Sequence, residues 1–333
     1  MVLEQEEGLP LGTGCYRYEA SGERLFLQAN PYHPTAAALP YDTIPLTAVS
    51  AAAERIAAFD SGDITAVTTD FSSPYALGYS SSYETCDYPT TSLLYVGFRA
   101  AEGACRSALV RRAFSQAFDR EELVRVHLSG HGDAAALPVS PLREGYDEAA
   151  AELLSYDPES AAALLAEAGY ERNEEDGLLY QRKTPLEVTL LVNSDNDVRQ
   201  AVAGQLADAL AQLGVAVTVN RLPWNDYTAA LAAGQFDLYI GEVRLPGDFD
   251  PTALLAGDLN YGGYYQEELA WALYQRQAQG EDEALWELLT RDAPIAPLCF
   301  KRGSLLVRWG MVSNLQPTRA NPYYRMDQWT TTG

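Results

Sequence analysis

Three segments decide the fold of this chain: LEVTLLVN (186–193), VAVTVNRL (215–222) and FDLYIGEV (236–243). Each is rich in the β-branched and aliphatic residues that favour strands. Between them stand two amphipathic stretches, VRQAVAGQLADALAQLG (198–214) and WNDYTAALAAG (224–234). Three strands separated by two helices predict a βαβαβ unit, in which right-handed crossovers build a parallel sheet.

The loop RLPGDFDPTALL (244–255) follows the third predicted strand. In open α/β sheets, ligands bind in the crevice outside the carboxyl ends of the strands. The loop therefore carries Arg244, Asp248 and Asp250 to the edge of the sheet where a ligand is expected.

The composition is that of a large, acidic, globular chain. Its 333 residues are enough for two domains, and 47% of them are hydrophobic, so the chain can build substantial cores. The 46 acidic and 23 basic residues give a formal net charge of −23. Such a charge opposes binding to nucleic acid and to anionic membranes, and it serves solubility or attracts cationic ligands. No run is long and uncharged enough for a transmembrane helix.

The four cysteines, Cys15, Cys86, Cys105 and Cys299, are scattered and form no CxxC pair. This spacing indicates neither a disulfide scaffold nor a zinc site, so buried free thiols are expected, with one long-range disulfide as the alternative. The segment MVLEQEEGLPLGTGCYRYE (1–19) lacks the basic and then apolar pattern of a signal peptide.

Further elements are predicted on both sides of the central unit. They are two strands at 15–20 and 24–30, a helix at 48–61, strands at 64–69 and 92–100, helices at 266–278 and 281–293, and an extended segment at 293–309. Two segments are expected to be irregular. Asn30–Pro45 contains four prolines, and Phe71–Pro89 is rich in serine and tyrosine.

Two helices have clear start signals. Asp119 precedes the helix that continues as REELVRVHL (120–128), with Glu122 placed to complete a capping box and Gly130 suited to the end. Asp157 and Pro158 predict a capped first turn for ESAAALLAEA (159–168).

The usual signatures of catalysis are missing from the sequence. It has neither a GxxxxGK[ST] phosphate loop nor a GxSxG nucleophile motif. His127 and His131 are four residues apart, but Gly130 interrupts the helix between them, so no metal site or cofactor is predicted. Asp248 and Asp250 could form the acid and base of a glycosidase if their carboxyl groups stood about 5–9 Å apart. The Asp250-Pro251 pair is, however, typical of a helix cap.

Ligand-binding residues are predicted around the same edge of the sheet. Asp248, beside Gly247, suits a ligand ammonium group. Trp224, at the start of the second crossover helix, either packs in the core or forms an aromatic wall. Arg244 pairs with Asp248, with Glu242 or with a ligand carboxylate, or it faces solvent. The loop tyrosines form an adaptable wall or cover the domain: Tyr261, Tyr264 and Tyr265.

Several motifs in a fixed order resemble those of one known family. They are LGTGCYRYE (11–19), SALVRRAFSQAFDREELVRVHLSGHG (107–132), YDPESAAALLAEAGY (156–170), WNDYTAALAAGQFDLYIGEV (224–243) and GDFDPTALL (247–255). The chain resembles the extracellular solute-binding proteins of family 5, the peptide- and nickel-binding components of ABC importers. Cys15 stands where that family usually has proline, and the loop after Asp248 is one residue shorter than usual.

The resemblance implies an α/β fold of the periplasmic-binding-protein class II type with two lobes and a discontinuous first lobe. It predicts that 1–97 and 304–333 form part of lobe I and that 98–303 form lobe II. The family chain starts with a membrane anchor, part of lobe I and a small extra domain. This chain therefore resembles the C-terminal portion of such a protein.

The resemblance also implies a function, which is capture of a small extended solute, most simply a short peptide, by closure of two lobes. Asp248 would neutralise the ammonium group and Trp224 would pack on the ligand, with Arg244, Tyr261 and Tyr264 lining the pocket. The chain would be a monomeric binding protein rather than an enzyme. It would act outside the cytoplasm beside ABC permease subunits, attached through an N-terminal lipid anchor that this chain does not contain. The alternatives are another solute, such as a nickel chelate or an oligosaccharide, and an extracellular hydrolase using Asp248 and Asp250.

Overall fold

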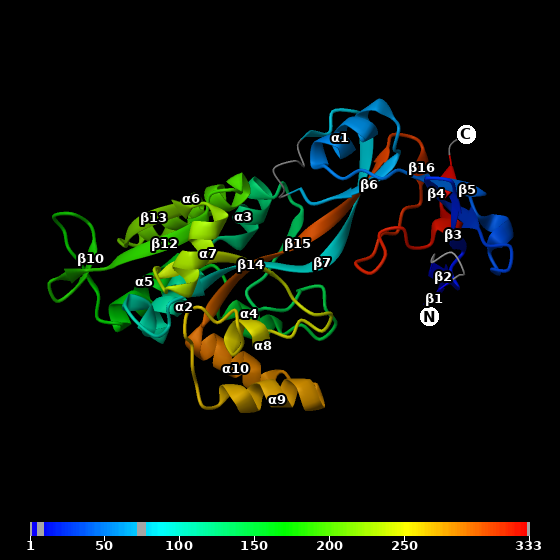
Figure 1. The fold of residues 1–333 in the computed structure, drawn as a ribbon. Coiled ribbons are helices and arrows are strands. Elements are labelled where there is room, and N and C mark those ends of the chain that lie inside the picture. Colours follow the sequence, from blue (N-terminus) through cyan, green and yellow to red (C-terminus); the bar gives the residue numbers. More distant parts are fainter. Residues whose placement is uncertain (1, 5–9, 72–77, 332–333) are drawn as a thin grey trace. The chain divides into compact units, whose positions relative to one another are not determined.

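The computed structural model describes residues 2–4, 10–71 and 78–331 (Figure 1). The chain forms two compact units. Unit 1 comprises Met1–Pro89 and Gly303–Gly333, and unit 2 comprises Thr90–Arg302. Across the described ranges, no helix combines the length and apolar character needed to cross a membrane.

The central sheet of unit 2 confirms the predicted βαβαβ unit. Its strands are β7 (Tyr83–Phe98, which begins in unit 1), β8 (Gly132–Ala134), β12 (Glu187–Asn193), β13 (Ala216–Leu222), β14 (Leu238–Arg244) and β15 (Ile295–Arg308, which ends in unit 1). They lie in the order β13-β12-β14-β7-β15, with β8 on β15. Strand β12 pairs in parallel with both β13 and β14, whereas β14 pairs with β7 in antiparallel fashion.

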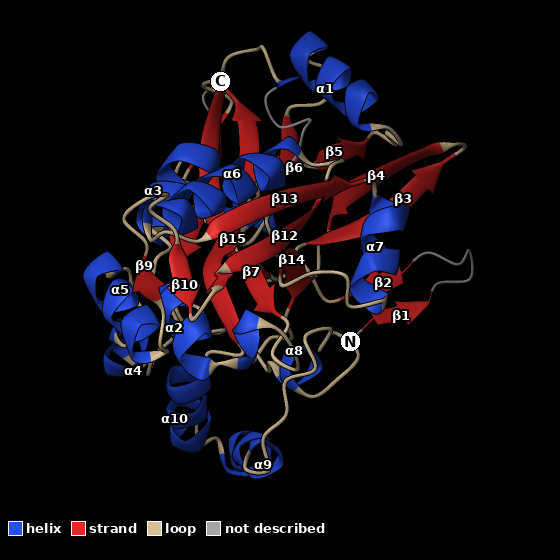
Figure 2. Cartoon of the chain, turned by 90° about the vertical axis from the view of Figure 1, so that its left-hand side faces the viewer, coloured by secondary structure: helices blue, strands red, loops and turns tan. Residues whose placement is uncertain are grey.

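Two helices cover opposite faces of this sheet (Figure 2). Helix α6 (Asp197–Gln212) connects β12 to β13, and α7 (Trp224–Ala232) leads from β13 back past β12 to β14. Because the two crossovers run in opposite directions and both are right-handed, their helices must lie on opposite faces. Leu206 and Leu210 of α6 accordingly pack in one core, and Tyr227 and Leu231 of α7 pack in the other.

The remaining elements of unit 2 surround these two cores. They are η3 (Ala104–Arg106), α2 (Ala108–Gln116), α3 (Arg120–His127), α4 (Glu148–Glu152), α5 (Pro158–Glu167), β9 (Glu171–Arg172), β10 (Leu179–Gln181), β11 (Thr184–Pro185), α8 (Thr252–Leu255), α9 (Leu269–Gln279) and α10 (Glu283–Asp292). The helices predicted at 266–278 and 281–293 correspond to α9 and α10, and the extended segment predicted at 293–309 corresponds to β15.

The predicted helix caps are confirmed at two positions. Asp119 accepts a hydrogen bond from the N–H of Glu122 (2.9 Å), and Asp157 accepts one from the N–H of Ser160 (2.9 Å). The prediction of a capping box is wrong, because the Glu122 carboxylate does not bond back to Asp119 but pairs with Arg125 one turn later (2.6 Å). An arginine at that spacing on the helix surface competes directly for the carboxylate.

Unit 1 consists of short strands and one longer helix. Its elements are β1 (Val2–Glu4), β2 (Pro10–Gly12), β3 (Tyr16–Ser21), β4 (Arg24–Ala29), η1 (Ala36–Ala38), β5 (Thr43–Leu46), α1 (Ala52–Ser61), β6 (Ala66–Thr69), β16 (Val312–Ser313), η4 (Met326–Gln328) and β17 (Thr330–Thr331). The strands predicted at 15–20 and 24–30 are confirmed as β3 and β4, which pair in antiparallel fashion through a turn that contains Gly22 (φ 62°). The helix predicted at 48–61 corresponds to α1, which starts four residues later and ends at Ser61 as predicted, with Gly62 (φ 90°) as its C-cap.

Two segments predicted to be irregular are partly strands. Pro45 lies in β5, which is an edge strand of the sheet β3-β4-β5, and an edge strand tolerates a residue without an N–H donor. Strand β7 starts at Tyr83 rather than near Ser92, so its first half lies in the segment 71–89. Residues 72–77 of that segment lie outside the described part of the chain.

The core of unit 1 is small and aromatic. Phe59 of α1 is fully buried and meets Tyr79 edge to face, with 5.3 Å between the ring centroids. The next residue, Asp60, accepts hydrogen bonds from the backbone N–H of Ser80, from its hydroxyl (2.6 Å) and from the N–H of Ser81 (3.0 Å). These bonds, that of the Ser80 hydroxyl first, lower the pKa of Asp60 from 3.8 to about 2.

We expect Asp60→Asn to lower the melting temperature of unit 1 at neutral pH, because an amide replaces a carboxylate that accepts several hydrogen bonds. A depressed pKa contributes stability above the unfolded value of 3.8, and this contribution disappears as the pH falls through about 2. The difference between wild type and variant should therefore shrink between about pH 4 and pH 2, as followed by circular dichroism. A difference that stays constant over this interval would contradict the assignment.

Candidate ligand-binding site

The carboxyl ends of three parallel strands meet at one edge of the unit 2 sheet. Strand β12 ends at Asn193, β13 at Leu222 and β14 at Arg244, and β12 lies between the other two. We use the name strand-end edge for this edge of the sheet together with the loops that follow the three strands. Because neighbouring strands are about 4.8 Å apart, the loops after β13 and β14 leave the sheet about 10 Å from each other.

Side chains of this protein already accept hydrogen bonds from the first turns of both crossover helices at this edge. Asn196 accepts a hydrogen bond from the N–H of Arg199 in the first turn of α6 (2.9 Å). Asp195 accepts one from the N–H of Trp224, the first residue of α7 (2.9 Å). The buried side chain of Asn193 in turn accepts the N–H of Asp195 (3.2 Å). Since the helix ends are already capped, a ligand at the strand-end edge would meet mainly side chains.

Trp224 is an exposed aromatic residue at this edge. Its side chain is 54% exposed, and one face of the indole stacks on Tyr227, with 5.8 Å between ring centroids and 26° between planes. Tyr227 is buried and donates its hydroxyl hydrogen to the carbonyl of Ile240 on β14 (2.7 Å). The indole is thus held against a core residue without being buried itself, so the core packing considered for Trp224 is wrong.

Asp248 has an exposed carboxylate on an anchored loop. One carboxylate oxygen accepts the N–H of Asp250 (3.2 Å), and the guanidinium of Arg276 donates to the Asp248 carbonyl (2.6 Å). Arg276 is buried and also pairs with Asp282. The buried Arg276 therefore fixes the backbone of the loop, while the carboxylate of Asp248 faces solvent.

Asp250 has the structural role that its sequence context predicts. Its carboxylate accepts hydrogen bonds from the N–H (2.9 Å) and hydroxyl (2.5 Å) of Thr252, the first residue of α8, and from Gln277 (3.0 Å). Burial acts to raise the pKa of Asp250, but these hydrogen bonds and the charge of Arg276 together lower it below its ordinary value. A carboxyl group held ionised in this way is poorly suited to act as a general acid.

The other predicted site residues have different environments. Arg244 ends β14, is exposed, and forms no ion pair with any residue in the described ranges. Tyr261 is 36% exposed and meets Tyr239 edge to face. Tyr264 is buried instead, and its hydroxyl donates to Asp292 (2.8 Å). This placement differs from the accessible wall predicted for Tyr264 and makes it a core residue.

A buried charge cluster at the same edge was not predicted. Glu242 of β14 pairs with Arg199 of α6 (2.7 Å) and with Lys301 of β15 (2.9 Å). The Lys301 side chain is only 7% exposed and the Glu242 side chain 20%. A lysine inside the apolar run PLCFKRGSLL (297–306) was the sequence signal for such a partner, because lysine is almost never buried without one.

Tyrosine hydroxyls lie behind this cluster. The hydroxyls of Tyr95 and Tyr239 are 3.3 Å apart in the core. Burial raises the pKa of Tyr95 to about 12 and raises those of Tyr227 and Tyr239 as well. All three therefore remain neutral at physiological pH and act as hydrogen-bonding groups rather than as bases.

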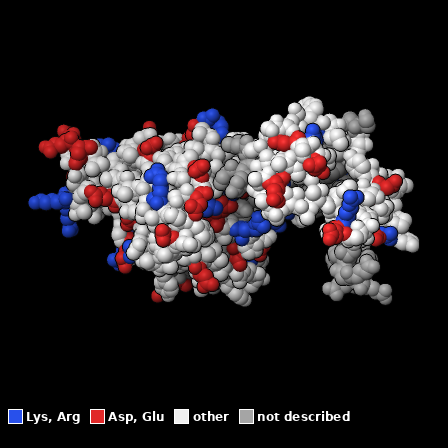
Figure 3. Space-filling model, turned by 45° about the horizontal axis from the view of Figure 1, so that its top comes forward, with Lys and Arg blue, Asp and Glu red and all other residues white. Residues whose placement is uncertain are grey.

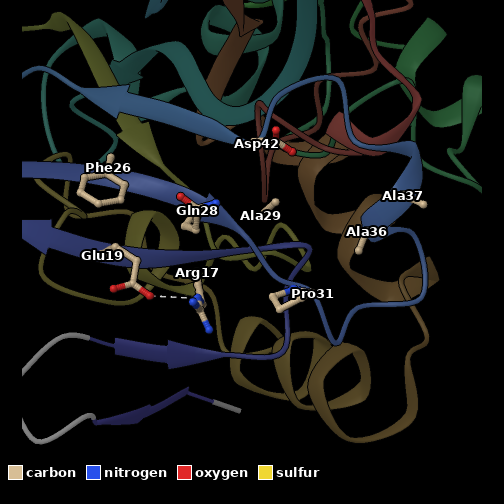
Figure 4. Close-up of a pocket in the computed structure, with 9 residues that line it drawn as sticks. All are labelled: Arg17, Glu19, Phe26, Gln28, Ala29, Pro31, Ala36, Ala37 and Asp42. Atoms are coloured by element: carbon tan, nitrogen blue, oxygen red, sulfur yellow. Dashed lines mark ion pairs between the residues drawn. The ribbon is translucent and has the colours of Figure 1, made fainter.

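A separate hollow lies in unit 1, against the sheet β3-β4-β5 (Figure 4). Its volume is about 750 Å³, and Arg17, Phe26, Gln28 and Asp42 are among its lining residues. Arg17 is already paired with Glu19 within the lining (2.9 Å). None of the predicted ligand residues lines this hollow, and we assign it no function.

The family model that matches this chain covers residues 3–265 and describes bacterial extracellular solute-binding proteins, family 5. The chain belongs to this family. The predicted resemblance is thereby confirmed, and the family description assigns its members to binding solutes outside the cell rather than to catalysis.

Among the family 5 relatives, the oligopeptide-binding protein AppA of Bacillus subtilis is 23% identical over 341 residues. That match covers 96% of this chain and 62% of AppA, so the chain spans less than two thirds of this relative. The structure of AppA with a nonapeptide matches with a TM-score of 0.63, at 21% identity, over 96% of this chain and 66% of that one. A nickel ABC transporter from Bacillus halodurans matches with a TM-score of 0.73, at 19% identity, over 98% and 71%. These likenesses confirm the predicted α/β fold.

On the face shown in Figure 3, acidic side chains are spread out rather than gathered in one block. At the strand-end edge, Arg199 and Lys301 both pair with the carboxylate of Glu242. The carboxylate therefore balances charges that would otherwise repel each other in a partly buried position.

We predict that Glu242→Gln lowers the free energy of unfolding by about 2–3 kcal/mol, because two cations then face a neutral amide. Urea denaturation followed by tryptophan fluorescence measures the change. The double variant Glu242→Gln/Lys301→Met serves as control and should recover most of the loss, since it also removes the buried cation. A loss below about 0.5 kcal/mol in the single variant would place Glu242 with ordinary exposed ion pairs.

Proposed function

We propose that this chain is the solute-binding part of an ABC importer and that it captures a short peptide at the strand-end edge of unit 2. The observation that carries this proposal is the exposed carboxylate of Asp248, held on a loop that Arg276 anchors through the backbone. A fixed carboxylate in an exposed position pairs well with the ammonium group at the start of a peptide.

The neighbouring side chains suit the rest of a peptide. The open face of Trp224 can pack on an apolar side chain, and Tyr261 offers a second half-exposed aromatic surface. Arg244 is exposed at the end of β14 and can pair with a peptide carboxylate. We leave Tyr264 out of this site because it is buried and bonded to Asp292.

The proposed role is binding rather than catalysis, outside the cytoplasm and in cooperation with membrane permease subunits. The name of AppA, an oligopeptide-binding protein, supports a peptide as the solute. The two-lobed closure and the lobe boundaries implied by the sequence remain predictions of the resemblance.

The alternatives differ in their support. A nickel chelate is favoured by the likeness to the nickel transporter structure from Bacillus halodurans. The hydrolase hypothesis needs both Asp248 and Asp250, and the carboxylate of Asp250 is engaged by hydrogen bonds from Thr252 at the start of α8. This engagement is the observation that makes hydrolysis the weaker candidate.

We expect Asp248→Asn to weaken peptide binding about tenfold or more, because the amide cannot neutralise an ammonium group. Isothermal titration calorimetry with pools of tri- to pentapeptides measures the affinity. N-acetylated pools should bind wild type as weakly as free peptides bind the variant, since acetylation removes the same charge.

Asp258→Asn is the matched control, because Asp258 is an exposed carboxylate in the same connecting segment with no assigned role. It should leave the affinity unchanged. Equal binding of free peptides by wild type and Asp248→Asn would remove Asp248 from the site. Binding of nickel–histidine in place of every peptide pool would favour the chelate, and release of nitrophenol from chromogenic glycosides would favour the hydrolase.

A further inference from the structure

Two neighbouring hollows lie on the surface of unit 2. The first has a volume of about 580 Å³ and lies between α3 and α6, which pack side by side (Figure 2). The second, of about 540 Å³, lies between the start of α3, β8 and α4. Asp119 and Tyr156 line both hollows, so the two lie next to each other. We call this surface the α3–α6 groove. It shares no lining residue with the proposed peptide site.

Small residues of α6 form the floor of the groove. Ala201, Gly204 and Ala209 line it, and the stretch from Ala201 to Gln212 runs roughly 17 Å along the helix. Val126 and Tyr156 stand at its sides with 48% and 51% of their surface exposed. The floor is therefore long enough for about three turns of another helix, and its small residues allow close approach.

Gly204 is not explained by the packing of this chain. It lies in the middle of a 16-residue helix, where glycine is less favourable than alanine. A Cβ atom placed on it would meet nothing within 4 Å. The missing side chain is therefore not required by any neighbour in unit 2, and its effect is to leave the groove floor at the level of the helix backbone.

The rim of the groove is acidic. Six carboxylates line it: Asp119, Glu121, Glu122, Glu148, Glu152 and Asp208. The guanidinium of Arg120 lies beneath the surface, where it donates to the carbonyls of Pro297 (2.7 Å) and Ser115 (3.1 Å). Glu122 is paired with Arg125. Glu121, Glu148 and Asp208 have no ion pair within the described ranges of the chain, so the rim carries uncompensated negative charge.

We propose that the α3–α6 groove docks an amphipathic helix of a partner protein whose polar side carries lysine or arginine. The close approach permitted at Gly204 seats the apolar side of this helix on the floor, and the carboxylates on both rims pair with its cations. Complementary charge guides the encounter and fixes the register, while contact with the floor supplies most of the affinity.

The probe for this surface is a synthetic 17-residue helical peptide of alanine, leucine and lysine, with a second peptide carrying glutamate in place of lysine. Fluorescence anisotropy at low ionic strength measures binding to the full chain. We expect the lysine peptide to bind and the glutamate peptide not to bind. Gly204→Leu should weaken binding about tenfold or more by filling the floor, while Gly204→Ala should have a smaller effect.

Charge reversal separates the groove from the acidic surface as a whole. The triple variant Glu121→Lys/Glu148→Lys/Asp208→Lys should abolish binding. The triple variant Glu281→Lys/Glu283→Lys/Glu287→Lys makes the same change in net charge around α10 and should bind nearly as wild type does. Circular dichroism and melting curves check that each variant is folded.

Three outcomes would overturn the proposal. They are equal weakening by both triple variants, unchanged binding by Gly204→Leu, and equal affinity for the lysine and glutamate peptides. Sedimentation velocity without peptide tests a second copy of the chain as the occupant, and self-association that Gly204→Leu removes would replace the proposed partner. Peptide-pool calorimetry on Gly204→Leu should be unchanged, so failure here is distinguishable from failure of the solute-binding proposal.

Discussion

The parallel pairing of β12 with both β13 and β14 is the constraint on which the arrangement of unit 2 depends. With β12 in the middle, the two crossover connections leave in opposite directions, and their helices cover opposite faces of the sheet. The carboxyl ends of all three strands then lie at one edge. Trp224 follows β13 and Asp248 follows β14. These two strands do not pair with each other, but both pair with β12, and this is why the two residues lie at the same edge.

Electrostatic balance at this edge rests on Glu242 rather than on the residues that we propose to bind the ligand. One carboxylate on β14 connects α6 through Arg199 and β15 through Lys301, so it links three elements of the sheet and its covering layer. Asp248 has a different environment, because its loop is held through a backbone carbonyl and the charge of its side chain remains exposed. The structural carboxylate of Glu242 and the carboxylate that we propose for the ligand, that of Asp248, thus lie six residues apart in the chain.

Local sequence patterns predicted much of this structure. The features that they did not predict depend on contacts between residues far apart in the sequence. The apolar periodicity of 186–243 was sufficient for the βαβαβ unit, and the caps at Asp119 and Asp157 depend only on the following turn. Strand β5 could not be recognised because its edge position, which permits Pro45, depends on pairing with β4. The partners of Glu242 stand 43 and 59 residues away in sequence, so no local motif connects them. Tyr264 resembled an exposed loop tyrosine because Asp292, which binds its hydroxyl, belongs to a later helix.

Helix α6 contributes residues to both the strand-end edge and the α3–α6 groove, and its buried side chains fix its orientation toward both. Arg199 in its first turn reaches Glu242 at the strand-end edge, while Gly204 faces the α3–α6 groove. The opposite side of the helix is fixed by Val202 and Leu210, which are completely buried in one core. A rotation of α6 that moved Arg199 would have to withdraw these side chains from a closely packed interior. The orientation of the groove floor and the position of the Arg199 guanidinium are therefore set by the same hydrophobic contacts.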